Sequence, residues 1–428
     1  MKIYLDTIGC RLNQAEIETM AGQFRAAGHE IAAFAAEADL VVINTCTVTA
    51  QAASDSRQKA RQAVRQGARE IVLTGCWSTL EPEQALNLPN VLKIIPNDRK
   101  ENLVSELLTI PPSQFELEPL ARKPLPGSHK RTRAFIKVQD GCDNHCTYCI
   151  TTIARGVANS RSRKSVIGDI QAALLGGSKE VVLTGVHLGA WGLDSKGENG
   201  RLRDLIRTIL NETDVPRLRL SSLEPWDLDD EFFNLWEDVR LCRHLHLPLQ
   251  SGSKSVLRRM ARKTTPEAYS DLIISIRSII PDIAITTDLI AGFPGETELE
   301  FGETLEFVER MGFSGGHVFT YSARPGTTAS RMPGHVPPEI RKKRNEKLRN
   351  LLAISKDIYT QNYIGKSMNV LWESSIQESV DSWKLEGLTD NYLIVQATSS
   401  QSRWNQIDCV ELTALEEEKI FGKIKFPL

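Results

Sequence analysis

Three closely spaced cysteines are the first feature of this sequence that points to chemistry. Cys142, Cys146 and Cys149 form a C-x3-C-x2-C motif within one short segment. Three thiolates on one loop can bind three irons of a 4Fe-4S cluster and leave the fourth iron without a protein ligand, in contrast to electron-transfer clusters held by four cysteines. An open iron can bind a substrate, as the open position of a catalytic zinc does. The alternatives are a zinc site that includes His145, or three unrelated thiols.

A second set of three cysteines is spread along the first part of the chain. Cys10, Cys46 and Cys76 each follow an expected β-strand, at residues 2–7, 40–44 and 71–74. A single such cysteine is more often a small buried apolar residue than a ligand. Because the carboxyl ends of neighbouring parallel strands converge, the repeated placement favours a second metal site. Cys242 and Cys409 lack any such setting and are expected to be free thiols.

The elements that must position these cysteines alternate between strands and helices. Residues 1–115 are expected to form a parallel α/β domain, in which helices at 14–27 and 50–66 separate the strands and a further strand lies at 91–95. A proline-rich stretch, residues 111–128, is typical of a linker. The first domain therefore ends there.

A second domain is expected over residues 131–355 and a third over 361–428. The second has six strand-and-helix units, which predict a parallel barrel or partial barrel with strands at 135–138, 180–183, 217–221, 244–249, 283–289 and 317–321. In such folds the working residues lie on loops at the carboxyl ends of the strands. Short β-prone runs at 368–372, 392–397 and 408–412 predict a small all-β module, so the whole chain belongs to the α/β class with an all-β tail.

Composition and charge are those of an ordinary soluble protein. Hydrophobic residues make up 41% of the chain and charged residues 25%, with a net charge of −2. Neither an apolar signal core nor a membrane-length apolar run is apparent, so we expect a cytoplasmic protein with no membrane partner, whose cysteines stay reduced. Basic residues nevertheless gather in three runs that could contact phosphate or be solvated surface, namely Arg122 to Lys137, Arg155 to Lys164 and Arg341 to Arg349.

With these residues in view, the chain resembles the radical S-adenosylmethionine methylthiotransferases over nearly its whole length. The motifs that carry the resemblance are Thr7-Ile8-Gly9-Cys10 with Asn13, Asn44-Thr45-Cys46, Gly75-Cys76, Lys137-Val138-Gln139-Asp140-Gly141-Cys142 and Ala154-Arg155-Gly156. The tail is similar to the TRAM module, a small RNA-binding β-barrel, at Glu386-Gly387-Leu388-Thr389. Between Gly156 and Arg161 the chain runs two residues longer than the family pattern.

The resemblance implies a central radical SAM barrel, two 4Fe-4S clusters and S-adenosylmethionine. Cys142, Cys146 and Cys149 would then hold the cluster that cleaves S-adenosylmethionine, and Cys10, Cys46 and Cys76 a cluster that handles sulfur. It also implies transfer RNA as substrate, a reductant protein of the flavodoxin or ferredoxin type, and a sulfur donor.

Loop motifs such as Leu220-Ser221-Ser222-Leu223-Glu224-Pro225 resemble the branch that methylthiolates carbon 2 of N6-threonylcarbamoyladenosine beside the anticodon. Alternatives are relatives that act on isopentenyladenosine in transfer RNA or on a ribosomal protein aspartate. A rival of another class is a non-catalytic, zinc-stabilised RNA-binding protein.

Five further residues at the ends of the barrel strands are candidate S-adenosylmethionine contacts. They are Gly185, His187, Ser222, Gln250 and Asp288. Each has a structural alternative: His187 as a satisfied histidine, Ser222 as a cap and Asp288 as a core hydrogen-bonding group. No catalytic residue is assigned beyond the cluster ligands, and Arg155 is expected to face either the cluster or the RNA.

Overall fold

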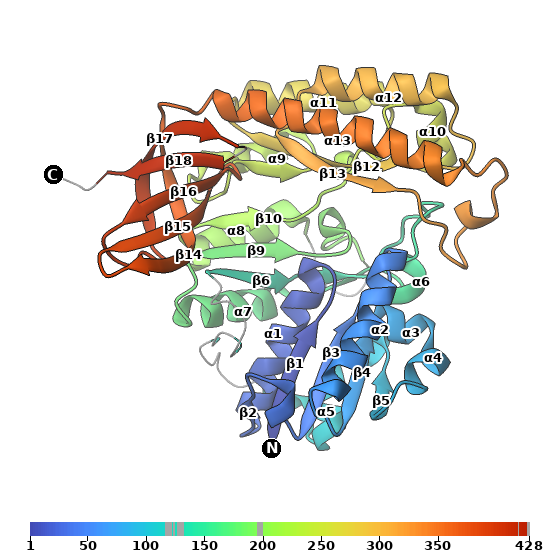
Figure 1. The fold of residues 1–428 in the computed structure, drawn as a ribbon, viewed down its shortest axis with the longest axis vertical. Helices are drawn as coiled ribbons and strands as arrows, with labels where there is room; N and C mark the ends of the chain where they lie inside the picture. Colours follow the sequence, from blue (N-terminus) through green and yellow to red (C-terminus); the bar gives the residue numbers. More distant parts are fainter. Residues whose placement is uncertain (116–121, 123–124, 126–131, 195–199, 418, 426–428) are drawn as a thin grey trace.

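The computed structural model describes residues 1–428 except 116–121, 123–124, 126–131, 195–199, 418 and 426–428. The described chain forms three parts that lie against one another (Figure 1). The predicted linker falls largely outside the described residues, so the domain limits 1–115, 131–355 and 361–428 stay predictions. Within the described residues, no helix is both long and apolar enough to cross a membrane.

The N-terminal part is a five-stranded parallel sheet with strand order β2-β1-β3-β4-β5. Its strands are β1 (Lys2–Thr7), β2 (Glu30–Ile31), β3 (Leu40–Thr45), β4 (Ile71–Gly75) and β5 (Val91–Ile95). Its helices are α1 (Arg11–Ala26), α2 (Ala50–Arg65), α3 (Cys76–Leu80), α4 (Pro82–Leu86) and α5 (Leu103–Leu108). Strands β3 and β4 are buried on both faces, as expected for central strands of a parallel sheet covered by helices.

The central part is an open parallel barrel. Two three-stranded sheets, β10-β9-β6 and β11-β12-β13, are joined by isolated bridges between β10 and the β11 segment. The strands are β6 (Arg133–Lys137), β9 (Glu180–Thr184), β10 (Leu218–Leu220), β11 (His244–His246), β12 (Ala284–Ala291) and β13 (Gly315–Thr320). The predicted partial barrel of six strands is thus confirmed, with β10 and β11 shorter than expected.

Helices follow the strands of this barrel, and one core of apolar side chains joins the longer helices to the strands. They are α6 (Thr151–Arg155), α7 (Arg163–Leu175), α8 (Leu202–Glu212), α9 (Asp230–Phe233), α10 (Lys254–Arg259), α11 (Pro266–Ile279), α12 (Glu298–Met311) and α13 (Pro338–Gln361). A short hairpin, β7 (Gln139–Asp140) with β8 (Asn159–Ser160), brackets the cysteine loop. Because β7 precedes the loop and β8 follows α6, both ends of the loop are tied together.

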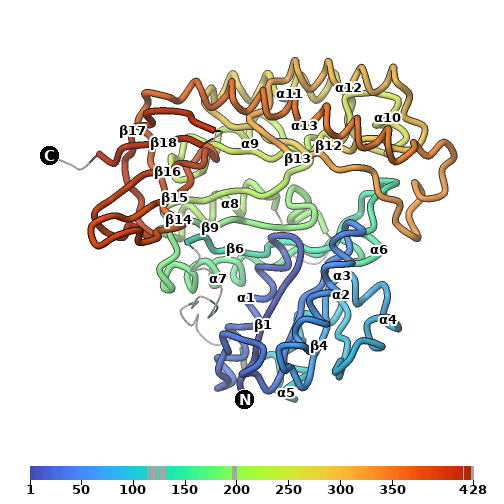
Figure 2. Tube along the Cα trace, in the orientation of Figure 1, coloured from blue at the N-terminus to red at the C-terminus, as the bar shows by residue number. Residues whose placement is uncertain are grey.

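The C-terminal part is a closed five-stranded barrel with order β14-β15-β16-β18-β17. Its strands are β14 (Ser367–Ser379), β15 (Ser382–Thr389), β16 (Ile394–Ser399), β17 (Ile407–Glu416) and β18 (Lys419–Ile424). The predicted all-β module is confirmed, although β15 and β18 were not expected from the sequence. Figures 1 and 2 show this barrel packed against the end of the central part rather than held apart on a tether.

Candidate functional site

The first cysteine set lies in the loop between β7 and α6. The loop is pinned at its base, where the backbone N–H of Cys142 donates to the carbonyl of Gly156 at 3.1 Å. Two thiols accept backbone hydrogen bonds of 3.4 Å, Cys142 from the N–H of Asn144 and Cys149 from that of Thr151. Burial raises the pKa of Cys149, and N–H groups of this kind stabilise the thiolate that a metal requires. The loop therefore presents its thiols ready to ligate.

His187 fixes one side of this loop. Its Nε2 lies 2.6 Å from Asp227 Oδ2 and its Nδ1 lies 3.3 Å from Asn144 Nδ2, while its backbone N–H donates to Gln139 Oε1 at 2.8 Å. Burial lowers the pKa of the imidazole, but the hydrogen bonds to Asp227 and Cys142 and the charges of those two groups together outweigh burial and raise the pKa to about 10. The contacts of His187 are those of a side chain that braces the cysteine loop.

Arg262 braces the other side. It forms a bidentate pair with Glu224, at 3.0 and 2.6 Å, and donates to the carbonyl of Pro248 at 2.6 Å. Its Nη1 also lies 4.0 Å from Cys146 Sγ. Glu224 belongs to a motif singled out in the sequence, but Arg262 lies 38 positions further on. No local pattern marks Arg262, because tertiary packing alone brings it to the thiol.

The second cysteine set comes together as the repeated placement after β1, β3 and β4 predicts. Cys10, Cys46 and Cys76 line the same cavity. A Cβ built on Gly9 would lie 2.7 Å from Cys46 Sγ, so the loop that carries Cys10 passes directly over Cys46. Burial above all, with smaller contributions from the neighbouring Cys10 and Cys76, raises the pKa of Cys46 to about 11. Thiols that oppose one another's ionisation in this way call for a cation between them.

Two asparagines border this second set. Asn97 donates from Nδ2 to Cys76 Sγ at 3.5 Å and to the carbonyl of Ala154 at 2.7 Å. Asn13 accepts from the Cys10 thiol at 3.7 Å. In the sequence Asn13 stands out only as part of a motif, and nothing marks Asn97, which begins a 3-10 helix at residues 97–102 after β5. Asn97 therefore links one thiol to the last turn of α6, the helix that follows the other cysteine loop.

A buried carboxylate with three cations joins the N-terminal part to the barrel. Glu16 pairs with Lys100 at 2.8 Å, Arg155 at 3.0 Å and Lys137 at 3.7 Å. Burial raises the pKa of Glu16, but the three cations hold it well below the usual range. Arg155 also donates to Asn13 Oδ1 at 2.6 Å. Arg155 is expected from the sequence to face a cluster or the RNA. In the structure its guanidinium is buried beside the second cysteine set.

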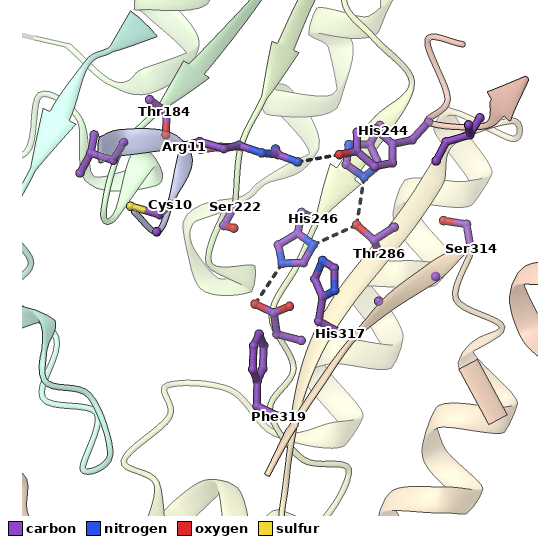
Figure 3. Close-up of a pocket in the computed structure, with 18 of the residues that line it drawn as sticks. Cys10, Arg11, Thr184, Ser222, His244, His246, Thr286, Ser314, His317 and Phe319 are labelled. Carbon is purple, nitrogen blue, oxygen red and sulfur yellow. Dashed lines mark hydrogen bonds and ion pairs between the residues drawn. The ribbon is translucent and has the colours of Figure 1, made fainter. Parts of the chain in front are cut away.

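A cavity of about 1020 Å³ lies where the three parts meet. The N-terminal part contributes the loops of the second cysteine set, the barrel contributes strand ends and inward-facing side chains, and the C-terminal module contributes the turn after β15. Figure 3 shows Cys10, Ser222, His246, His317 and Phe319 around this space. The volume exceeds what a nucleobase alone would fill, so a whole modified nucleotide fits.

The five candidate S-adenosylmethionine contacts divide into two groups. Gly185, Ser222 and Asp288 line the cavity, and Asp288 Oδ1 is buried without a hydrogen-bond partner. His187 and Gln250 do not line it. Gln250 has φ of +73° and pairs through its backbone with Asp288 and Ile290. The roles of all five as contacts stay predictions.

Two family descriptions match the chain. Residues 2–96 match "Uncharacterized protein family UPF0004", and residues 136–308 match the "Radical SAM superfamily". A threonylcarbamoyladenosine tRNA methylthiotransferase, MtaB, of Bacillus subtilis is 36% identical over 91% of this chain and 88% of that protein. Its namesake in Thermotoga maritima is 36% identical over 98% of this chain and 96% of that protein.

The chain belongs to the radical SAM tRNA methylthiotransferase family. A tRNA-2-methylthio-N(6)-dimethylallyladenosine synthase of Oceanobacillus iheyensis is also similar, with 32% identity over 98% of this chain and 83% of that protein. Among solved structures, the radical S-adenosylmethionine methyltransferase TsrM of Kitasatospora setae has a TM-score of 0.58 and 15% identity, and the match covers 77% of this chain and 74% of that one. At that identity the likeness supports the fold alone.

The donor set of this family member suits an iron-sulfur cluster, because each triplet consists of cysteines alone and cysteine thiolates are the ligands of such clusters. The radical SAM superfamily uses S-adenosylmethionine with a 4Fe-4S cluster. The Cys142 loop has the three thiols that such a cluster needs.

The basic runs serve different purposes from one another. Arg155 and Arg344 are buried, and Arg344 pairs with Glu296 at 3.2 Å, so neither is free to contact phosphate. Other members of the run on α13 are exposed, namely Lys342, Lys343, Lys347 and Arg349. Lys123, Lys130 and Arg131 lie outside the described residues. Phosphate contact therefore stays a prediction for the exposed α13 residues and for exposed Lys164, and it is untested for the three residues outside the described part.

Proposed function

We propose that this protein adds a methylthio group to carbon 2 of the N6-threonylcarbamoyladenosine beside the anticodon of transfer RNA, in the cytoplasm. The observation that carries the proposal is the arrangement of two separate cysteine triplets. One lies on a braced loop of the barrel and the other borders a nucleotide-sized cavity between the three parts. Relatives in Bacillus subtilis and Thermotoga maritima, each 36% identical to this chain, bear the name of this activity.

The chemistry explains why two metal sites are needed. Carbon 2 of adenine is neither nucleophilic nor acidic, so replacing its hydrogen by sulfur requires a cofactor that supplies radical chemistry. Cys142, Cys146 and Cys149 would hold a 4Fe-4S cluster, which supplies one electron for the reductive cleavage of S-adenosylmethionine. Cys10, Cys46 and Cys76 would hold a second, which supplies a site for the sulfur that is methylated and transferred. A flavodoxin- or ferredoxin-type protein and a sulfur donor complete the proposed partners.

Other side chains of the protein hold the two cysteine triplets in position around the cavity. His187 and Arg262 keep the Cys142 loop in place from opposite sides, through Asn144 and Cys146. Arg155 and Asn97 connect that loop and its helix to the second cysteine set. Ser222 and Asp288 offer a hydroxyl and an unpartnered carboxylate oxygen at the cavity wall, which suit ribose and amino groups of S-adenosylmethionine. The chain thus keeps both triplets at a fixed separation around one substrate space.

Two triple variants test the division of labour. Replacing Cys142, Cys146 and Cys149 by Ala should abolish 5′-deoxyadenosine formation, because alanine offers iron no ligand. Replacing Cys10, Cys46 and Cys76 by Ala should leave one cluster and continued 5′-deoxyadenosine formation, but give no methylthiolated RNA. Iron content, 5′-deoxyadenosine and modified nucleosides are measured for each. Methylthiolation at near wild-type rate in the second variant would refute the sulfur-handling role.

The substrate is tested with two RNA stem-loops under anaerobic conditions. One carries threonylcarbamoyladenosine and the other isopentenyladenosine at the same position, and mass spectrometry detects the methylthio product. We expect product from the first. Product from the isopentenyl RNA alone would favour the activity of the Oceanobacillus iheyensis relative instead, and zinc without iron in anaerobically purified protein would favour a structural metal.

A further inference from the structure

One wall of the cavity is built from ring side chains on the last strands of the barrel. Strand β13 is the edge strand of its sheet, and His317 and Phe319 stand two residues apart, so they share a face. Both line the cavity, as does His246 on β11. Figure 3 shows the three rings gathered on one side of the space, with Cys10 on another side.

The rings form a connected series with one fixed end. The ring centroids of His246 and His317 are 6.4 Å apart, and those of His317 and Phe319 are 6.2 Å apart, each pair tilted by 49°. His246 is held in place by Thr286 at 2.9 Å and Asp288 at 3.2 Å. Phe319 at the other end is 42% exposed and lines this cavity. An apolar ring that is exposed to a cavity gains favourable free energy when a flat group stacks on it and removes its surface from water.

A nucleobase is the flat ligand that this wall suits. Bases in RNA loops are splayed out and stacked on aromatic side chains and histidine by proteins that recognise them. The cavity is lined by the second cysteine set, and none of Cys142, Cys146 and Cys149 lies in its wall. S-adenosylmethionine must reach the first set, whereas sulfur would come from the second, so a base on the β13 side of this space lies in the same cavity as the set that delivers sulfur.

We propose that Phe319 and His317 form the stacking surface for the target adenine of the RNA. The inference rests on the proposed function and deepens it, because it names the surface that selects the base. A ring held by its faces keeps its edges free, and carbon 2 of adenine lies on an edge. Stacking therefore fixes the plane of the base while leaving the reacting atom open to the Cys10 side of the cavity.

The test compares an RNA stem-loop that carries the target adenosine with the same RNA made abasic at that position. Binding to the full-length protein is measured by fluorescence anisotropy. Wild-type protein should bind the adenosine RNA about 5- to 100-fold more tightly than the abasic RNA. The variant Phe319→Ala should shrink this ratio towards one, and Phe319→Trp should retain most of it because indole also stacks. If Phe319 had a merely structural role, the Phe319→Ala change would weaken the binding of both RNAs equally and leave the ratio of their affinities unchanged.

Phe34→Ala is the matched control, because Phe34 is 62% exposed on the N-terminal part and does not line the cavity. It should keep the wild-type ratio. A ratio near one in wild-type protein overturns the proposal whatever the variants do, which covers the case of a Phe319→Ala protein that does not fold. Loss of S-adenosylmethionine binding by Phe319→Ala with an unchanged ratio would assign the ring to the cofactor instead. A wild-type protein that binds the base but never methylthiolates RNA would refute the proposed function and leave this surface standing.

Discussion

Glu180 is a buried carboxylate that pairs with two arginines at the contact between the barrel and the C-terminal module. It is fully buried on β9 and pairs with Arg219 at 2.7 Å and Arg217 at 3.0 Å. The same two arginines donate to backbone carbonyls of Leu388 and Thr389 in the C-terminal module. One carboxylate therefore neutralises both of these arginines, which donate hydrogen bonds to the C-terminal module.

We predict that Glu180→Gln lowers the free energy of unfolding by about 3–5 kcal/mol at pH 7, because it leaves two buried cations without a counter-charge. Burial raises the pKa of Glu180, but the arginines lower it from 4.5 to about 2. A depressed pKa means that the stabilisation is present above pH 4.5 and is lost as pH falls towards 2. Urea unfolding should show that the difference in free energy of unfolding between wild type and variant becomes smaller as pH falls over that range. A difference in free energy of unfolding that does not depend on pH would contradict this prediction. The control Glu212→Gln, at an exposed position, should unfold with almost the same free energy as wild type.

Asn97 is the residue through which we expect the protein to tune the reduction potential of the proposed second cluster. Its amide donates to Cys76 Sγ, and hydrogen bonds to cluster sulfurs raise the reduction potential. Asn97→Ala should therefore shift the potential of the second cluster to more negative values while the first is unchanged. An anaerobic redox titration followed by electron paramagnetic resonance measures both. Exposed Asn87→Ala is the control, and equal potentials in wild type and Asn97→Ala would rule out the hydrogen bond as a tuning element.

At the scale of elements, the strand-to-loop turns that carry cysteines depend on glycine. Gly75 ends β4 with φ of +95°, and a Cβ there would lie 2.2 Å from the carbonyl oxygen of Thr45. Gly141 precedes Cys142 with φ of +66°, and its Cβ would lie 1.9 Å from the carbonyl oxygen of Val157. Both clashes are with backbone, so neither can be relieved by moving a side chain.

Each turn should therefore control its own cluster. Gly141→Ala should lose the iron bound by the Cys142 loop, and Gly75→Ala should lose the iron of the second set, so each variant keeps about half of the iron after reconstitution. Gly302→Ala is the control, because a Cβ on that residue of α12 meets nothing within 4 Å. It should keep all iron and gain about 0.5–1 kcal/mol of stability, as a helix-interior glycine replaced by alanine does. Full iron in either turn variant would show that the loops tolerate the change.

The same scale shows what sequence patterns reveal and what they miss. Strands β1 and β5 lie where alternation and apolar runs place them, and the cysteines of both sets follow strands, Cys76 as the first residue of α3. Strands β15 and β18 were missed because each contains a glycine, Gly387 and Gly422, which weakens a strand pattern. Strand β18 completes the barrel by pairing antiparallel with β17 and, at two positions, parallel with β16. Asn97 and Arg262 escaped notice for a related reason. Their contacts with thiols exist only after distant segments pack, and neither residue type is rare enough to stand out.

At the scale of the whole molecule, the C-terminal module is part of the cavity wall. Arg243 pairs with Asp390 at 2.7 Å, and Arg219 donates to the backbone carbonyl of the same residue at 2.9 Å. This places the turn after β15 over the barrel, where Tyr392 stacks on His244 with centroids 4.2 Å apart and 13° between the planes. An RNA that binds the module would thus contact the same turn that closes the substrate space.

Tyr392 joins all three parts, and its hydroxyl accepts a hydrogen bond from Arg11 of the N-terminal part at 2.7 Å. Tyr392→Phe should break this link while keeping the stack on His244, so the cavity should open more often between α1 and the module. Hydrogen–deuterium exchange should then rise several-fold in residues 8–13 and 388–394, since a hydrogen bond to a charged group contributes about 1.5–3 kcal/mol. Tyr4→Phe removes a hydroxyl whose bond to Asp6 stays within the N-terminal part, and it should leave exchange in 388–394 unchanged. If Tyr392→Phe exchanged like wild type in both segments, the Arg11 contact would contribute nothing to closure, and the stack on His244 together with the arginine contacts would hold the module over the cavity.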